Sequence, residues 1–251
     1  MTMPRLSVVV ITLNEEDRLR ETLARVAWAD EIVVVDAGSE DKTVALAREF
    51  TDHVLIHPWQ GFAAQKNVGI AHATGDWILS LDADEHVEPA LREEITAVLQ
   101  APDARDGYRI ARRNIMWGRW IRHGRLYPDW QLRLFRRGRG RFVERAVHES
   151  VQVDGTIGRL AAPLLHHSYR DVSDFLRRAD RYSTLAAEEW TRAGRPFCAT
   201  QLLTAPLGRF LSMYVVHRGF LDGWRGFLLA VLYAYYVFIR SAKIWEKVKQ
   251  A

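Results

Sequence analysis

The chain has 251 residues, of which 48% are hydrophobic and 26% are charged, with a formal net charge of +4. This balance is typical of a folded protein and excludes a disordered or low-complexity chain. The single cysteine, Cys198, excludes an intrachain disulfide and fits a reducing compartment, and we interpret it as a small apolar core residue.

The amino-terminal segment is predicted to form a first strand rather than a signal peptide. Its short apolar run, LSVVVIT (6–12), is followed by Asn14 and an acidic cluster, with no small-residue cleavage site. Three more runs rich in β-branched residues are EIVVVD (31–36), HVLI (53–56) and DWILSLD (76–82). Continuous apolar runs of this kind indicate strands buried on both faces, as in a parallel sheet.

Helical patterns separate these strands and follow the last of them. They are marked by Leu19, Leu23 and Val26 after an Asn14 cap, by Leu46 and Phe50 after Ser39, by Ala64, Val68 and Ala71 after Gly61, and by Leu91, Ile95, Val98 and Leu99 after Pro89. Strand and helix therefore alternate. We predict an α/β fold with a doubly wound, mainly parallel sheet flanked by helices.

The second half of the chain has a different pattern. Residues 106–165 are irregular, with short strands predicted at 108–111, 131–135 and 147–153, and the chain is predicted to be helical from Val172 onward. We therefore predict a catalytic domain over residues 1–168 and a helical region over residues 169–251. The tail contains fourteen uncharged, mostly apolar residues, 226–239, which is fewer than the roughly 20 that a membrane-spanning helix needs.

Polar residues follow the first, second and fourth predicted strands, where parallel sheets bind their ligands. No glycine pattern typical of dinucleotide-binding folds or of P-loop proteins is present. Asp82 and Asp84 lie one residue apart after the fourth strand, and carboxylates in this arrangement can share Mg²⁺ or Mn²⁺. Such a cation would hold a diphosphate leaving group. Glu85 and His86 are predicted to belong to the turn into the next helix. The alternative for Asp82 and Asp84 is an acidic helix cap before Pro89.

Four stretches occur in order and carry a family resemblance: VVVITLNEE, EIVVVDAGSEDKT, KNVGIAHATGDWILSLDADE and VHES. Together they resemble glycosyltransferase family 2, the inverting nucleotide-sugar transferases with the GT-A fold, over roughly residues 5–167. The stretches YPDWQLRLFRRGRGRF, VHES and PLLHHSY resemble the lipopolysaccharide core-biosynthesis glucosyltransferase branch of that family.

The resemblance implies roles for individual residues. The nucleotide-sugar would be bound by Thr12, Leu13, Glu15, Asp36, Lys66, Asp82 and Ala83, with Asp36 on the base. Asp36 could instead cap the following turn, and Lys66 could be a solvated helix lysine. The sequence also departs from the frequent family pattern, since Ile11 and Leu13 replace proline and tyrosine.

An inverting transfer needs a general base that removes the proton of the acceptor hydroxyl. Glu149 in VHES matches the acidic position of the family, with Glu144 as its nearest competitor. His148 could tune the site, and His166 or His167, after the predicted last strand, could complete the metal site with Asp82 and Asp84.

The segment 105–145 carries thirteen arginines and three acidic residues, which implies an anionic partner. Arginine forks and aromatic rings, among them Arg125, Arg133 and Trp130, would bind a lipid-linked anionic saccharide rather than nucleic acid. The aromatic and basic tail suits amphipathic helices at a membrane surface, although it could also pack within the protein or form an oligomer contact.

The sequence thus predicts a bacterial enzyme at the cytoplasmic face of the inner membrane. Its reaction would be metal-dependent inverting transfer of a hexose, glucose above others, from a UDP-sugar to a lipid-linked saccharide such as the lipopolysaccharide inner core. One alternative keeps the fold with polyprenyl phosphate as acceptor, which needs no general base. The other is a non-catalytic membrane adaptor.

Overall fold

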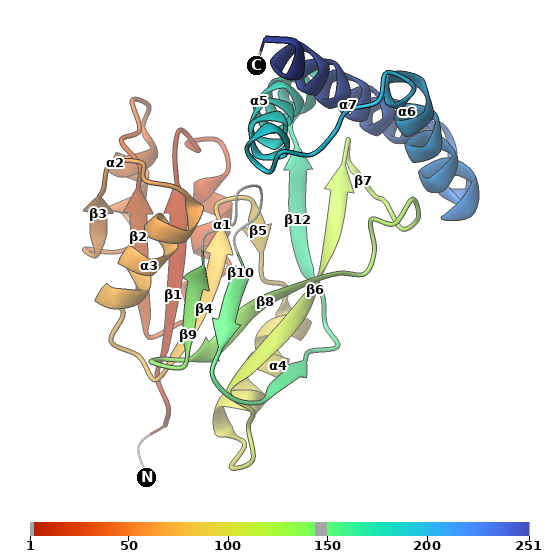
Figure 1. The fold of residues 1–251 in the computed structure, drawn as a ribbon. Helices are drawn as coiled ribbons and strands as arrows, with labels where there is room; N and C mark the ends of the chain where they lie inside the picture. Colours follow the sequence, from red (N-terminus) through yellow and green to blue (C-terminus); the bar gives the residue numbers. More distant parts are fainter. Residues whose placement is uncertain (1–2, 144–149, 251) are drawn as a thin grey trace. The chain divides into compact units, whose positions relative to one another are not determined.

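The computed structural model describes residues 3–143 and 150–250. The chain divides into two compact units: unit 1 contains Met1–Arg112 and Asp129–His166, and unit 2 contains Arg113–Pro128 and His167–Ala251 (Figure 1). Unit 2 thus takes up a segment from the middle of the chain as well as the helical tail.

Unit 1 is built on a mixed sheet that begins with alternating strands and helices. In chain order its first elements are β1 (Leu6–Thr12), α1 (Leu19–Ala24), β2 (Glu31–Asp36), α2 (Thr43–Ala47), β3 (Val54–Ile56), α3 (Phe62–His72), β4 (Trp77–Asp82), β5 (Glu85–His86) and α4 (Pro89–Gln100). The later ones are β6 (Gly107–Met116), β8 (Asp129–Arg136), β9 (Gly140–Val143), β10 (Ser150–Val153), β11 (Ile157–Arg159) and β12 (Leu164–Tyr169). Strands β6 and β12 continue into unit 2.

The parallel half of the sheet confirms the pattern of apolar runs. Strands run in the order β3-β2-β1-β4, all parallel, with Val9 beside Val33 on one side and Ser80 on the other. Every residue of β1 and β2 is buried. Both faces of these strands are covered, so a continuous apolar run, not an alternating one, is the sequence that fits.

The antiparallel half joins the arginine-rich segment to this sheet. Strand β8 pairs with β4 with Ile78 opposite Phe135, and β6 pairs with β8 in turn. The strands predicted at 108–111 and 131–135 are therefore confirmed, within longer elements. The pairing of β8 with β4 brings residues that are about 50 positions apart in sequence to the same edge of the sheet.

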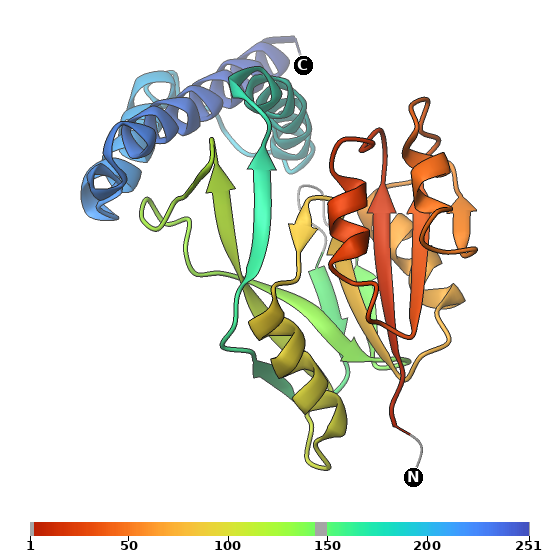
Figure 2. The same cartoon turned by 180° about the vertical axis from the view of Figure 1, so that it is seen from behind.

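Two apolar clusters cover the two faces of the sheet. One packs α1, α2 and α4 on side chains such as Val8, Val10 and Leu79. The other packs α3 and the β9–β10 hairpin on Val9, Val35 and Ile78. Figure 1 shows α3 in front of the sheet, and Figure 2 shows α1 and α4 from the other side.

Several local expectations differ from the structure. The first helix has no side-chain cap: Asn14 takes a left-handed conformation with φ 53°, and its Oδ1 accepts a hydrogen bond from the Glu40 amide instead. Helix α2 ends at Ala47, before Phe50. Cys198 is exposed in the turn before α6, where its Sγ lies 3.1 Å from Thr200 Oγ1, so it is not a core residue.

The residues after Asp84 and before the helical tail also differ from the expectation. Glu85 and His86 do not belong to a turn into the helix but form β5, which pairs with β12. His166 and His167 lie inside β12 rather than after it. Both differences arise from the pairing of β5 with β12, whose residues are about 80 positions apart in sequence. No local sequence pattern predicts such a pairing.

Unit 2 contains the helical tail. Its elements include β7 (Arg119–Trp120), α5 (Val172–Arg192), α6 (Gln201–Leu211), a π-helical turn η1 (Ser212–Val216), a 3-10 turn η2 (Gly219–Asp222) and α7 (Gly223–Gln250). Apolar contacts of Met116, Ile121 and Leu229 and of Phe175 and Leu232 form its core. The stretch Gly219–Lys249 is long and apolar enough to cross a membrane by length and composition, and one third of its most apolar window is buried within the structure.

One close approach in unit 1 gives a test of the fold. A Cβ at Gly69 of α3 would lie 2.3 Å from Val9 Cγ1 and 3.0 Å from Val35 Cγ2. We expect Gly69→Ala to lower the free energy of unfolding by about 1–3 kcal/mol, because overpacking outweighs the gain in helix propensity. The matched control is Gly208→Ala in α6, where nothing lies within 4 Å. Urea denaturation measures both, and a Gly69→Ala chain as stable as the control would contradict this packing.

Candidate functional site

The carboxyl ends of β1, β2 and β4 meet at one edge of the sheet in unit 1. Thr12 lies beside Asp36, and Ile11 lies beside Asp82, so the polar residues that follow three separate strands are brought together. This is the edge at which parallel sheets bind ligands. The residues predicted from the first, second and fourth strands therefore share one site region.

Asp36 is fully buried and accepts four hydrogen bonds within the protein. Its Oδ1 accepts from the amides of Gly38 (2.9 Å) and Ser39 (2.7 Å), and its Oδ2 accepts from Thr12 Oγ1 (2.9 Å) and Ser39 Oγ (2.5 Å). These bonds close the turn after β2, in which Gly38 takes φ 96°. The carboxylate therefore fixes the shape of this loop, and a base would have to replace one of these donors to bind it.

The other predicted nucleotide contacts surround this loop. Leu13 is 44% exposed at the end of β1, which leaves an apolar side chain open to a ligand. The Glu15 amide donates to Thr43 Oγ1 over 2.8 Å, and this ties the loop after β1 to α2. Ala83 is buried, and its carbonyl accepts a hydrogen bond from Thr22 Oγ1 over 2.6 Å.

An alternating chain of six charges lies beside Asp82. In order, the ion pairs are Lys66 Nζ to Asp82 (2.8 Å), Asp82 to Arg133 (2.6 Å), Arg133 to Glu85 (2.6 Å), Glu85 to Arg112 (3.4 Å) and Arg112 to Asp129 (2.6 Å). We call these six residues the charge chain. They come from α3, β4, β8, β5 and β6, so the chain connects five elements of unit 1.

The charge chain is mostly removed from solvent. Lys66 and Glu85 are fully buried, and Arg133 is 4% exposed, whereas the Asp82 side chain keeps 27% exposure. Burial acts to raise the pKa of Asp82, but the positive charges of Arg133 and Lys66 outweigh it and hold that pKa well below its usual value. Asp82 is therefore an ionised carboxylate at neutral pH. Its side chain is partly exposed, as are those of Arg112 and Asp129 at the other end of the charge chain.

Asp84 lies apart from this chain. Its Oδ1 is 3.6 Å from His166 Nε2, and its Oδ2 is 3.4 Å from Arg18 Nη1. Burial and the charge of Arg112 lower the pKa of His166 to about 4, so its imidazole is neutral at pH 7. The two carboxylates that were predicted to share a cation therefore contact different sets of partners.

The donor atoms here fit a divalent cation only in part. A carboxylate oxygen of Asp84 and a neutral imidazole nitrogen of His166 are suitable ligands, whereas Asp82 is held by two cationic side chains. Across residues 3–143 and 150–250, no three histidine, cysteine or acidic side chains surround a common metal position. A cation at this edge would therefore take its remaining ligands from the bound substrate or water.

The predicted acceptor and base residues are distributed over different parts of the chain. Arg133 is buried and serves two internal carboxylates, and Trp130 on β8 lies under the Arg159 guanidinium at 4.9 Å. Arg125 is exposed in unit 2, which also contains His167. The predicted base Glu149, its competitor Glu144 and His148 lie outside the described residues.

Sequence reasoning missed Glu85, Arg112, Asp129 and Arg18 as parts of the site. A usable signal was present in DWQLRLF, where Asp129, Gln131 and Arg133 alternate with apolar residues and so share one face of a strand. Nothing in the sequence showed that this strand would lie next to β4. The burial of Glu85 could not be inferred without that neighbour.

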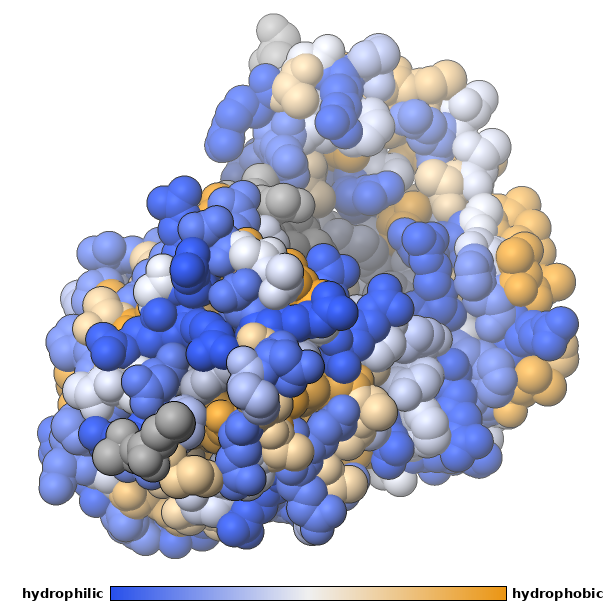
Figure 3. Space-filling model, turned by 90° about the horizontal axis from the view of Figure 1, so that it is seen from below, coloured by the Kyte–Doolittle hydropathy of each residue, from blue (hydrophilic) through white to orange (hydrophobic). Residues whose placement is uncertain are grey.

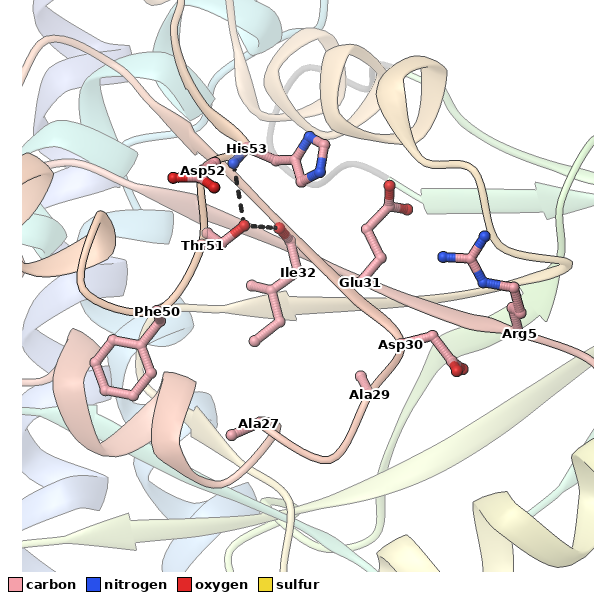
Figure 4. A pocket seen from close by; sticks show the side chains of 10 residues that line it. All are labelled: Arg5, Ala27, Ala29, Asp30, Glu31, Ile32, Phe50, Thr51, Asp52 and His53. Carbon is pink, nitrogen blue, oxygen red and sulfur yellow. Dashed lines mark hydrogen bonds between the residues drawn. The ribbon is translucent and has the colours of Figure 1, made fainter.

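A hollow of about 320 Å³ lies at the opposite, amino-terminal ends of β1 and β2. Figure 4 shows its lining: Arg5, Ala27, Ala29, Asp30, Glu31, Ile32, Phe50, Thr51, Asp52 and His53. Glu31 is engaged by Ser7 and by the amide and hydroxyl of Thr74, and Thr51 donates to the Ile32 carbonyl. These hydrogen bonds hold the strand ends together. Parallel sheets bind ligands at the carboxyl ends of their strands, so this hollow is not at the edge where the donor site is predicted.

Comparison with known proteins agrees with this architecture. The model of glycosyl transferase family 2 matches residues 7–159. A lipopolysaccharide core biosynthesis glycosyltransferase, LpsC from Rhizobium meliloti, is 32% identical over 96% of this chain and 92% of its own length.

Among solved structures, a mannosyltransferase from Pyrobaculum calidifontis in complex with GDP-Man and Mn²⁺ has a TM-score of 0.55 at 17% identity, over 98% of this chain and 89% of that one. S. aureus TarS in complex with UDP-GlcNAc has a TM-score of 0.50 at 16% identity, over 98% and 92%. The GT-A fold predicted from the sequence is thereby confirmed.

The contribution of the charge chain to the free energy of unfolding can be tested at Arg133. Arg133→Met would leave the buried Glu85 with one longer ion pair, and we expect it to lower the free energy of unfolding by about 3–5 kcal/mol. The double variant Arg133→Met/Glu85→Met removes the uncompensated charge and should recover most of that loss. Urea denaturation is the measurement, with Arg139→Met as the matched control, because Arg139 pairs with Asp154 at the surface. Equal losses for the single and double variants would contradict the role given to Arg133.

Proposed function

The chain belongs to glycosyl transferase family 2, and we propose that it transfers a hexose, with glucose as the first candidate, from a UDP-sugar to a lipid-linked anionic saccharide such as the lipopolysaccharide inner core. The observation that carries this proposal is the similarity to LpsC over 96% of the chain, helical tail included. That alignment therefore includes unit 2 as well as unit 1.

The donor is proposed to bind at the edge formed by β1, β2 and β4. Thr12, Leu13, Glu15 and Asp36 lie around the loop that would hold the nucleoside, and Asp82 and Ala83 lie at the adjacent strand end. Lys66 and Arg133 already hold one anion, the Asp82 carboxylate, in a buried setting. A diphosphate would compete for the same two cations, and we propose that Lys66 contacts it when the donor is bound.

The proposed cofactor is Mg²⁺ or Mn²⁺. Asp84 and His166 would supply an oxygen and a nitrogen ligand, and Asp82 would join them as its cationic partners turn to the donor. Bound there, the cation would neutralise charge on the departing diphosphate. His167 is the alternative histidine from the sequence, but His166 is the one that lies next to Asp84.

The proposed reaction is a direct displacement with inversion at the anomeric carbon. Glu149 would take the proton of the acceptor hydroxyl while the diphosphate leaves from the opposite side of the sugar. The low pKa of Asp82 suits it to charge pairing rather than to proton transfer at neutral pH, so the base must be a different carboxylate. This division of roles favours the downstream glutamate.

The arginine-rich segment supports the proposed acceptor, and the places where the two substrates reside support the proposed location. Arginine side chains and Trp130 would bind phosphate, carboxylate and sugar groups of the acceptor, with Arg125 as a further contact. Because a UDP-sugar is cytosolic and a lipid-linked saccharide is held in a membrane, we place the enzyme at the cytoplasmic face of the bacterial inner membrane, attached through its helical tail. A homo-oligomer would be compatible with this arrangement.

A variant of the proposed base separates the two acceptor classes. Glu149→Gln should lower kcat for a core oligosaccharide acceptor by about 100-fold to 10,000-fold, because the hydroxyl then loses its base. Release of UDP from a panel of UDP-sugars, with and without Mn²⁺, is the measurement, and Glu144→Gln is the matched control. Near-normal turnover of Glu149→Gln with a polyprenyl phosphate acceptor, and none by wild type with saccharides, would favour the polyprenyl-phosphate enzyme instead.

A further inference from the structure

The outward face of α7 carries a stripe of exposed apolar side chains. Its members, here called the α7 stripe, are Trp224, Phe227, Val231, Tyr235, Phe238, Trp245 and Val248, each at least 40% exposed. They recur at intervals of three, four or seven residues, which places them on one side of the helix over a length of about 36 Å. A surface helix of a soluble protein would present polar residues on this side. An exposed apolar stripe of this length therefore indicates a binding surface that another molecule shields from water.

The opposite face of α7 is bound to α5 by apolar and polar contacts. Leu232 packs with Phe175 and Ala179, and Lys243 Nζ donates to Asp180 Oδ1 (2.6 Å) and to Thr184 Oγ1 (2.7 Å). One turn further, Lys247 lies 3.6 Å from Glu188. Crossing a membrane would strip these cations of their partners or take α5 into hydrocarbon with them. The structure therefore opposes a spanning role for α7.

The turn between α6 and α7 forms an apolar tip. Val216 is 70% exposed and Leu221 53% exposed, and the rings of Phe210, Tyr214 and Phe227 contact one another with centroids 5.4–5.9 Å apart. The turn packs closely on the start of α7, because a Cβ at Gly226 of α7 would lie 1.9 Å from the carbonyl oxygen of Gly219 in η2. Apolar side chains gather at the right-hand edge of Figure 3, the side on which α6 and the start of α7 lie in Figure 1.

Basic side chains surround this tip. The loop before β8 is fastened to it by Asp222, which accepts hydrogen bonds from the amides of Arg122 and His123 and lies 3.1 Å from His123 Nδ1. The basic collar consists of Arg122, Arg125, Arg218 and Arg225. Residues 113–128 contain no acidic residue, and the only one in 193–245 is Asp222, whose carboxylate is buried and engaged by that loop. The tip is thus apolar, and its surroundings are positively charged.

We propose that the α7 stripe and the tip dock on a bilayer surface with anionic headgroups, and that α7 lies in the plane of the membrane instead of crossing it. The apolar side chains would enter the acyl boundary, and the basic collar would meet the headgroups. Nucleic acid would satisfy the arginines but leave the stripe uncovered, and a second copy would cover the stripe but not neutralise the collar. This inference rests on the proposed function only for its lipid-linked acceptor.

Depth measurements at single cysteines test the proposal on the full chain. Cys198 is exposed, so Cys198→Ser gives a cysteine-free background. Val216→Cys, Val231→Cys and Phe238→Cys place an environment-sensitive fluorophore on the tip and along the stripe, and Leu176→Cys on α5, 39% exposed, is the matched control. Vesicles of phosphatidylcholine mixed with phosphatidylglycerol, with brominated lipids of graded depth as quenchers, are added without donor or acceptor.

The proposal predicts similar shallow depths at residues 216, 231 and 238 and no membrane signal at residue 176. A label at 231 or 238 near the bilayer centre, with 216 shallow, would show a spanning helix and overturn it. Absence of any signal would overturn it too, as would a stable dimer that covers the stripe and ignores vesicles. None of these outcomes depends on sugar transfer, so the proposed function can fail or stand separately.

The collar is tested by vesicle flotation of the native sequence and of Arg218→Gln. Wild type should bind phosphatidylglycerol-containing vesicles more tightly than pure phosphatidylcholine, and loss of the Arg218 charge should weaken binding to the former by about fivefold. Arg139→Gln, in unit 1, is the control and should bind as wild type. Equal binding of wild type to both kinds of vesicle would contradict the role of the collar.

Discussion

The ion pairs around Asp82 are the constraint on which the site in unit 1 depends. Glu85 and Lys66 are completely buried, and a buried charge without a partner costs several kcal/mol. Each is tolerated because β4, β6 and β8 supply side chains of opposite charge within 3.4 Å. The same pairs hold the Asp82 carboxylate ionised and partly exposed at the edge where the loops after β1, β2 and β4 meet. The side chains that stabilise this part of the sheet are thus the ones that we propose for donor binding.

The local parts of the fold could be predicted from the sequence. Apolar runs gave β1, β2 and β4 to within a residue or so, and Pro89 marked the start of α4, because these signals lie within a few residues of their effect. The features that could not be predicted arise from non-local contacts. β8 pairs with β4, and β5 with β12, although the paired residues are more than 50 positions apart in sequence. These two pairings bury Arg133 and Glu85.

The candidate site shows the same division. Asp36 and Asp82 stand at strand ends and Lys66 on α3, within stretches that carry the family resemblance, so the sequence makes them candidates. Arg112 and Asp129 join the charge chain only through their neighbours in the folded sheet. In unit 2, the composition of the tail predicted an amphipathic surface, but which face is apolar and which is bound to α5 could be known only from the packing. Sequence patterns identify candidate side chains, and the packing of the folded protein decides which of them are exposed to a ligand or a membrane.

We propose that the cations paired with Asp82, Lys66 and Arg133, contact the donor diphosphate when it binds. Calorimetric titration of UDP into the protein, with and without Mn²⁺, measures this contact. We expect metal-dependent binding to wild type that weakens by at least about tenfold in Lys66→Met, since a charge-assisted hydrogen bond to the diphosphate would be lost, while Lys249→Met should bind as wild type. Binding that needs no metal and is equally tight in Lys66→Met would contradict it.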